Sequence, residues 1–304
     1  MIMFQIISDS GCDLNAQETT KYNVKIVPFY INFDHEVPLR EGVDINNEDY
    51  FKRLTSEKGV FPKTSQPSPQ DYIDTYKPYL EAGKDIIILT ISSKLSGSHN
   101  SASLAANILK DEFPTRKIMI IDSLSVSVGQ GLILREIIKM RDAGFSIDRT
   151  VSTAEKVVKS TRIYFTLDTI EYLKKGGRVG TVTALVGGIL GLRPILQLEE
   201  GAVSQLDSVR GKKRAMKLIE DAMVDALKDE IKNINIGIGH VLSKDDATSF
   251  QVNTETALGI KIANPLTEIG AAIGTHAGPG ALGFAYCKKY QCFTTFTKKS
   301  EAVA

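Results

Sequence analysis

The sequence lacks an excess of charge of either sign and any long hydrophobic run. Its 304 residues carry 37 basic and 36 acidic side chains, for a net charge of +1, so the charge balance favours neither nucleic acid nor a membrane surface as a partner. No run of about 18 apolar residues occurs, so we expect no transmembrane helix and no stable membrane insertion. The N-terminus lacks a basic region followed by a cleavage site, so we also expect no signal peptide.

Cysteine is scarce, and two nucleotide-binding motifs are missing. Cys12, Cys287 and Cys292 have neither zinc-site spacing nor a CxxC pair. So few cysteines favour a reducing, cytoplasmic location, and we assign none of the three a role. The sequence holds no GxxxxGK[ST] motif, and GQG at 129–131 is only a fragment of a dinucleotide fingerprint. We therefore predict no nucleotide cofactor and no metal.

Apolar runs and helical patterns alternate along the first half of the chain. The predicted strands span residues 4–7, 25–33, 86–91 and 117–121. Helical patterns lie between them, and Asp13 is expected to cap the first helix. This alternation predicts a parallel sheet covered by helices on both faces.

The pattern changes around residues 145–151, where one helix ends and the next begins. We place a domain boundary there, which gives an N-terminal domain of residues 1–147 and a C-terminal domain of residues 148–304. In the second domain we expect Asp168 to cap a short helix. A hairpin is predicted to turn at Glu200 and Gly201. The later strand and helix patterns predict a second α/β domain.

The stretch from 86 to 102, IIILTISSKLSGSHNSA, predicts a strand, a small-residue loop and a helix. The loop carries hydroxyls, among them Ser96, and Gly97 follows. Open α/β sheets bind ligands at the carboxyl ends of their strands, so the loop is a candidate binding site. The serines could equally do no more than cap the helix, and the stretch alone does not separate the two interpretations.

Two further loops hold candidate site residues. Thr64 lies in KTSQPSP, which its two prolines hold extended, although the same loop could be a simple linker. His276 lies in THAGPG, within a glycine-rich stretch that we interpret as a loop. A lone histidine is more often structural, but its position in such a loop favours a functional role.

Hydroxyls and an imidazole N–H can all donate to a carboxylate, which is costly to bury without partners. A tail of about 16 carbons would add a gross hydrophobic term on the order of 10 kcal/mol, before ordering costs. An anion with an apolar tail is therefore one candidate ligand. A serine hydrolase acting on acyl esters through Ser96 and His276 is the enzyme alternative, although LSGSHNSA is not the GxSxG elbow and no acid has a clear claim to orient the histidine. A protein-interaction module would have no need of the hydroxyl loops.

Six motifs in order, from Ser8 to Gly283, resemble the DegV family: SDSGCDL, TSQPSP, ISSKLSGSHNSA, DTIEYLKKGGRVG, LRPIL and GTHAGPGALG. The family consists of bacterial fatty-acid-binding proteins. The resemblance implies a two-domain fold, with a parallel-sheet α/β/α N-terminal domain and a second α/β domain with a mixed sheet. It further implies a carrier that is not itself an enzyme. The carrier would present a bound long-chain fatty acid to a separate fatty acid kinase, which forms the acyl phosphate.

The resemblance also implies roles for individual residues. Ser96, Thr64 and His276, with Gly97 beside them, would hold the carboxylate, and Arg178 and Arg210 would meet the kinase. The tail would lie between and within the domains, against an apolar run that could also be a plain core helix. Its expected contacts there are Ile189, Leu190, Leu192 and Ile195. The chain departs from the family pattern in SGSH and in the glycine-rich run before LRPIL, which leaves the length and saturation of the acyl chain open.

Overall fold

A four-stranded parallel sheet forms the core of the first half of the chain. The computed structural model describes residues 4–56, 61–180 and 192–294. The strand order is β2-β1-β6-β7, and all six residues of β1 are buried, as expected for a strand covered on both faces. The strands are β1 (Phe4–Asp9), β2 (Val24–Val27), β6 (Asp85–Thr90) and β7 (Ile118–Asp122).

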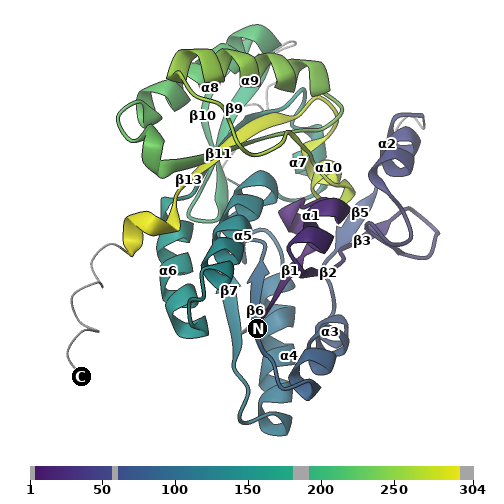
Figure 1. The fold of residues 1–304 in the computed structure, drawn as a ribbon. Helices are drawn as coiled ribbons and strands as arrows, with labels where there is room; N and C mark the ends of the chain where they lie inside the picture. The colour runs from purple at the N-terminus through teal and green to yellow at the C-terminus, as the bar shows by residue number, and fades with distance from the viewer. Residues whose placement is uncertain (1–3, 57–60, 181–191, 295–304) are drawn as a thin grey trace.

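Helices cover both faces of this sheet. On one face, apolar residues of α3 (Pro69–Glu81) and α4 (Ser98–Glu112) pack with Ile7 and Ile86. On the other face, α5 (Ser127–Asp142) and α6 (Ile147–Ser160) pack in one cluster with β1 and β6. Nearly every residue of α5 is buried, because it lies between this sheet and the second one (Figure 1).

A six-stranded mixed sheet forms the second half, in the order β10-β9-β8-β13-β11-β12. Only the pairing of β11 with β12 is parallel among its strands as described. The outer face is covered by α8 (Lys212–Leu227) and α9 (Lys244–Leu258). The strands are β8 (Arg162–Thr166), β9 (Leu192–Glu199), β10 (Ala202–Arg210), β11 (Ile234–His240), β12 (Thr267–Glu268) and β13 (Leu282–Lys288).

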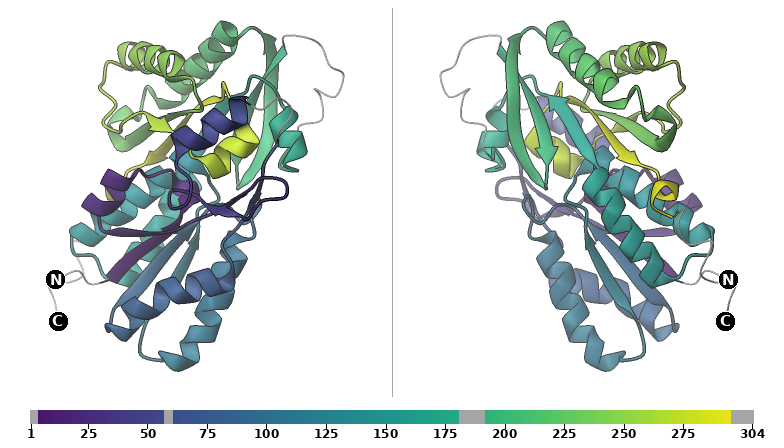
Figure 2. Two further views of the ribbon diagram at one scale, coloured as in Figure 1. Left: turned by 90° about the vertical axis from the view of Figure 1, so that its right-hand side faces the viewer. Right: turned by 90° about the vertical axis from the view of Figure 1, so that its left-hand side faces the viewer.

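Smaller elements project from the first half toward the second. Here β3 (Tyr30–Asn32) pairs antiparallel with both β4 (Leu39–Arg40) and β5 (Lys63–Ser65). Beside them, α2 (Asn47–Ser56) lies next to the short helix α10 (Ala271–Ala277), as Figure 2 shows. The remaining short helices are η1 (Ser10–Cys12), α1 (Ala16–Lys21), α7 (Glu171–Lys175), η2 (Ile231–Asn233) and η3 (Tyr290–Phe293).

The predicted fold class is confirmed, with a parallel first sheet and a mixed second sheet. The predicted hairpin at Glu200 and Gly201 is also confirmed, since β9 and β10 pair antiparallel across it. The predicted domain boundary falls one residue after α6 begins at Ile147, and it stays a prediction. Among the described helices, none has both the length and the apolar character that crossing a bilayer requires.

Four details of the prediction are wrong. The single strand over 25–33 breaks at Pro28, which cannot donate to a sheet ladder, and its halves join different sheets as β2 and β3. The expected loop around His276 is the helix α10, and β13 was not predicted from the glycine-rich sequence around it.

The other two errors concern helix caps. Asp13 does not cap α1, because Asn15 does so in a capping box with Glu18. Asp13 has a left-handed backbone, with φ of 50°, and faces the second half of the chain. Asp168 pairs with Arg193, and the N–H of Glu171 at the start of α7 donates to the Thr169 Oγ1 over 3.2 Å.

Candidate functional site

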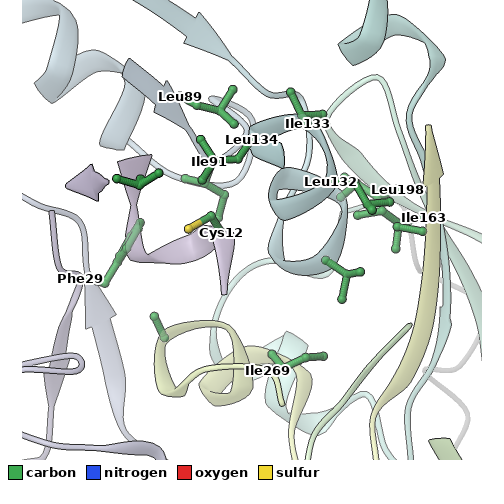
Figure 3. Close-up of a cluster of buried hydrophobic side chains, with 14 of the residues drawn as sticks. Cys12, Phe29, Leu89, Ile91, Leu132, Ile133, Leu134, Ile163, Leu198 and Ile269 are labelled. Atoms are coloured by element: carbon green, nitrogen blue, oxygen red, sulfur yellow. The ribbon is translucent and has the colours of Figure 1, made fainter. Parts of the chain in front are cut away.

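A cavity lies between the two sheets and draws its walls from both halves of the chain. About 1020 Å³ of space there is free of protein atoms, open solvent at the mouth included. The walls are mostly apolar. Figure 3 shows five of the lining side chains, Phe29 and Ile91 from the first half and Ile163, Leu198 and Ile269 from the second. Among the described lining residues, few side chains are polar, and they are Thr64, Gln66, Ser96, Ser127, Arg178 and His276.

Thr64 and His276 form a direct pair on the cavity wall. Thr64 is the middle residue of β5, whose pairing with Ile31 of β3 fixes its position. His276 lies in the last turn of α10, 212 positions after Thr64 along the chain. The Thr64 Oγ1 and the His276 Nε2 are 2.7 Å apart and hydrogen-bonded. The fold therefore brings together two residues that lie in separate motifs of the sequence.

Ser96 reaches the same cavity from the loop between β6 and α4. Its backbone N–H donates to the carbonyl of Ser92 over 3.1 Å, and its Oγ accepts from the N–H of Ser98 over 3.2 Å. Gly97 follows as the residue before α4 and is exposed. A Cβ at Gly97 would lie 2.9 Å from the Gln66 Nε2, so the small residue lets the Gln66 side chain pack against the loop.

The imidazole of His276 is held neutral. Burial, with a smaller contribution from the charge of Arg178, lowers the pKa of His276 to about 4 from its ordinary 6.5. Its Nδ1 has no hydrogen-bond partner among the described residues. The ring packs so closely against Gly176 that a Cβ there would lie 2.0 Å from this nitrogen. A neutral ring keeps one donor and one acceptor, so it can serve as a hydrogen-bonding partner without adding charge.

The two arginines named from the sequence occupy different places. Arg178 lines the cavity and binds two backbone carbonyls, with its Nε 3.2 Å from the oxygen of Leu95 and its Nη1 2.6 Å from that of Gly176. It thereby ties the Ser96 loop to the turn beneath His276. Arg210 ends β10 and is exposed. Their contact with a kinase stays a prediction.

Residues 3–289 match the model described as "Uncharacterised protein, DegV family". The chain belongs to the DegV family. A DegV domain-containing protein of Clostridium acetobutylicum is 31% identical over 285 residues, which cover 93% of this chain and 96% of the relative. The predicted family is therefore confirmed.

Solved structures of the family share the fold over nearly the whole chain. A stearic acid-binding protein from Eubacterium ventriosum superposes with a TM-score of 0.91 at 30% identity, covering 95% of this chain and 100% of its own. A DegV family protein from Thermus thermophilus, whose structure is described as one of fatty acid binding, has a TM-score of 0.85 at 31% identity. There the coverage is 94% of this chain and 99% of that one.

The cavity wall of this DegV chain differs from the wall expected from the sequence. Ile189 and Leu190 lie outside the residues that the structure describes. Leu192 is partly buried at the start of β9, and Ile195 is buried in the cluster beneath α8 and α9. Neither is among the described residues that line the cavity, and their role in binding a tail stays a prediction. Leu198, on the opposite face of β9 from Ile195, does line it.

Two carboxyl groups that were not predicted as site residues, the partly buried Asp13 and the buried Glu41, hold the other end of α10. Asp13 Oδ1 accepts from the N–H of Gly270 over 3.0 Å, and Glu41 Oε1 accepts from that of Ala272 over 2.7 Å. Burial raises the pKa of both carboxyl groups, that of Asp13 well above its usual value, and their mutual repulsion adds to the shift of Asp13. Both acids come from the first half of the chain, so they fix the helix that carries His276. Glu41 has no sequence motif that could have identified it.

Proposed function

We propose that this DegV protein binds a long-chain fatty acid, with the tail in the cavity between the sheets and the carboxylate at Thr64, Ser96 and His276. The observation that carries the proposal is the Thr64–His276 pair, which lines the same largely apolar cavity as Ser96. A carboxylate taken from water needs hydrogen-bond donors. The Ser96 hydroxyl can donate, and so can the Thr64 hydroxyl when the His276 Nε2–H donates to its oxygen. The fatty acid binding described for the relatives from Eubacterium ventriosum and Thermus thermophilus supports the same ligand class.

The shape of the site supports a carrier, and we propose that a separate fatty acid kinase phosphorylates the bound carboxylate. The protein itself would contribute no catalytic step and no cofactor, and it would work in the cytoplasm. Arg178 and Arg210 are the proposed kinase contacts. Of the two, Arg210 is the cleaner probe because it is exposed, whereas Arg178 also holds the Ser96 loop. Arg210→Glu should slow phosphorylation by the kinase while the protein keeps its bound lipid, and loss of the lipid would count against a contact role.

A serine hydrolase is the weaker candidate on geometric grounds. In a triad the histidine faces the nucleophile and an acid orients the ring. The His276 Nε2 is hydrogen-bonded to Thr64, while its Nδ1 has no partner among the described residues. A serine-reactive fluorophosphonate should therefore leave Ser96 unlabelled, and stoichiometric labelling of Ser96 would favour the hydrolase.

Native mass spectrometry of the purified protein, followed by lipid extraction, tests the proposal directly. We expect about one fatty acid per chain, either co-purified or acquired from a panel of free acids. Ser96→Ala should weaken binding of hexadecanoic acid by about tenfold, because it removes one hydrogen bond to a charged group. Ser93→Ala is the matched control, since Ser93 is exposed on the same loop and is not among the described cavity-lining residues. A protein that stays empty with every acid would overturn the proposal.

A further inference from the structure

Asp9 is a fully buried carboxylate at the end of β1, beside the proposed site but not among the described residues that line the cavity. Three donors converge on it. Its Oδ2 accepts from the backbone N–H of Ile91 over 2.9 Å and from the Ser98 Oγ over 2.6 Å. Its Oδ1 accepts from the Gln130 Nε2 over 2.8 Å. Such a set suits a carboxylate, which only accepts hydrogen bonds when ionised.

Two of these donors stand at opposite ends of one loop. Ile91 directly follows β6, Ser98 is the first residue of α4, and the segment between them carries Ser96. One oxygen atom, Asp9 Oδ2, binds both ends. Within the loop, the N–H of Ser98 donates to the Ser96 Oγ. The side chain of Ser98 therefore binds Asp9 while its backbone binds the proposed ligand-holding hydroxyl.

We infer that Asp9 is a positioning residue for the carboxylate site: by clamping Ile91 and Ser98 to one oxygen, it fixes the place from which Ser96 meets the ligand. The inference rests on the proposed function, because it assigns Asp9 to that same site. Asp9 acts through Ser98 and does not touch the ligand. A site of this kind must be held to within about 0.5 Å for its donors to reach the ligand, which is why the clamp matters to affinity as well as to folding.

The electrostatics of the buried Asp9 carboxyl group favour a role beyond packing. Burial raises the pKa of Asp9, and the hydrogen bonds from Ser98, Gln130 and Ile91 counteract that shift. An apolar residue at this place would avoid the cost of burying a carboxylate, but it could not join the two ends of the loop. The alternative is that Asp9, with its hydrogen bonds satisfied, contributes only to stability. The two roles predict different effects of substitution on ligand affinity.

The neighbouring tyrosine supplies a matched pair of variants. The Ser98 Oγ is also hydrogen-bonded to the hydroxyl of Tyr72 over 2.6 Å. Ser98→Ala removes the bond to Asp9 and the bond to Tyr72, whereas Tyr72→Phe removes only the second. Both side chains are fully buried, so each variant costs stability, and Ser98→Ala costs more because it removes two buried hydrogen bonds. Only Ser98→Ala opens the clamp.

The experiment compares the affinities of hexadecanoic acid and 1-hexadecanol, each displacing a fluorescent fatty acid from the purified protein. The preference for the acid is the dissociation constant of the alcohol divided by that of the acid. We expect Ser98→Ala to lower this ratio by about tenfold, the worth of one hydrogen bond to a charged group, and Tyr72→Phe to leave it within about twofold. Loss of stability alone would weaken both ligands equally and leave the ratio unchanged. A ratio that Ser98→Ala does not change, or that Tyr72→Phe lowers as much, would overturn the inference.

Asp9→Ala serves where Ser98→Ala does not fold. It removes the oxygen that binds both Ile91 and Ser98, so the clamp opens and the ratio should fall; an unchanged ratio would sink the inference here too. The wild type and Ser96→Ala separate this inference from the proposed function. If the wild type shows no preference for the acid, the proposed function fails. If Ser96→Ala loses the preference while Ser98→Ala and Asp9→Ala keep it, only the role of Asp9 fails.

Discussion

The two ends of α10 are both polar and both buried against the first half of the chain, but they differ in how their polar groups are satisfied. At the N-terminal end, Asp13 and Glu41 accept from backbone N–H groups of the helix start, and from the hydroxyls of Ser127 and Ser10. At the C-terminal end, His276 is bound to Thr64 through one nitrogen and leaves the other unpaired among the described residues. One end is a saturated anchor, and the other keeps hydrogen-bonding capacity at the cavity.

This difference indicates how a short helix can serve binding. A helix of seven residues has little stability of its own, so its position must come from tertiary contacts. The carboxylate anchor supplies such contacts far from the ligand. The histidine at the other end can then pair with Thr64 without also having to hold the helix in place.

The largest effect should come from removing the anchor. Glu41→Ala leaves the Ser10 hydroxyl and the Ala272 N–H, which donate to Glu41 over 2.5 and 2.7 Å, without their acceptor. Buried donors without partners cost about 1–3 kcal/mol each, so we expect the free energy of unfolding in urea to fall by about 2–4 kcal/mol. Glu36→Ala is the control, because Glu36 pairs with Arg53 at the surface and such pairs contribute at most about 1 kcal/mol. Equal losses in the two variants would contradict the anchor.

The next effect should appear at the open end, as a loss of ligand affinity. Gly176 has an ordinary φ of −76°, so alanine fits its backbone, but the added Cβ would lie 2.0 Å from the His276 Nδ1. We expect Gly176→Ala to displace the ring from Thr64 and to weaken binding of hexadecanoic acid by about tenfold, the worth of one hydrogen bond. The measurement is displacement of a fluorescent fatty acid.

Gly177→Ala is the matched control for that variant. Gly177 has a φ of +69° and open space around its Cα, so alanine there strains the backbone by about 1 kcal/mol without touching the histidine. It should lower stability while leaving affinity within about twofold. Unchanged affinity in Gly176→Ala, or an equal loss in Gly177→Ala, would show that the position of His276 does not matter for binding.

The candidate residues at the open end of α10 could be named from the sequence, although the helix itself was not predicted, and the anchor residues could not be named. Thr64, Ser96 and His276 each lie in a distinctive motif, and all three line the same cavity. Asp13 was interpreted as a helix cap because its neighbours along the chain suggest one. Its hydrogen bond to Gly270 spans 257 positions, and a pairing this remote leaves no local pattern. Glu41 likewise pairs with a residue far along the chain, Ala272.

The cavity wall illustrates a second limit. Successive residues of a strand face opposite sides, so β9 presents Leu198 to the cavity and Ile195 to the cluster beneath α8 and α9. Hydrophobicity alone could not distinguish the two faces, because both are covered. Local pattern was sufficient for the first sheet, whose parallel strands alternate with clear helices, but not for β13, which lies within a glycine-rich sequence.

The smallest effect is a change in how the free energy of unfolding depends on pH, to which the two ends of α10 contribute with opposite signs. The folded protein disfavours a proton on His276, whose pKa is lowered to about 4. It favours a proton on Asp13, whose pKa is raised well above its ordinary value. Stability from the histidine is therefore complete above its unfolded pKa of about 6.5 and is lost as the pH falls toward 4. Stability from Asp13 is complete below its unfolded pKa of about 3.9 and is lost as the pH rises.

Between pH 4.5 and 6.5 the two groups thus contribute slopes of opposite sign to the free energy of unfolding against pH. Each slope is at most about 1.4 kcal/mol per pH unit. His276→Gln removes the rising contribution, so unfolding in urea should show a slope against pH more negative than that of the wild type. Asp13→Asn keeps an oxygen for the Gly270 N–H and removes the falling contribution, so its slope should be more positive. Because each variant is compared with the wild type, the titrating groups that do not interact with the substituted residue cancel. If both variants change the slope of the free energy of unfolding against pH in the same direction, burial shifts the protonation of both groups in the same sense. The contrast between anchor and open end would then fail.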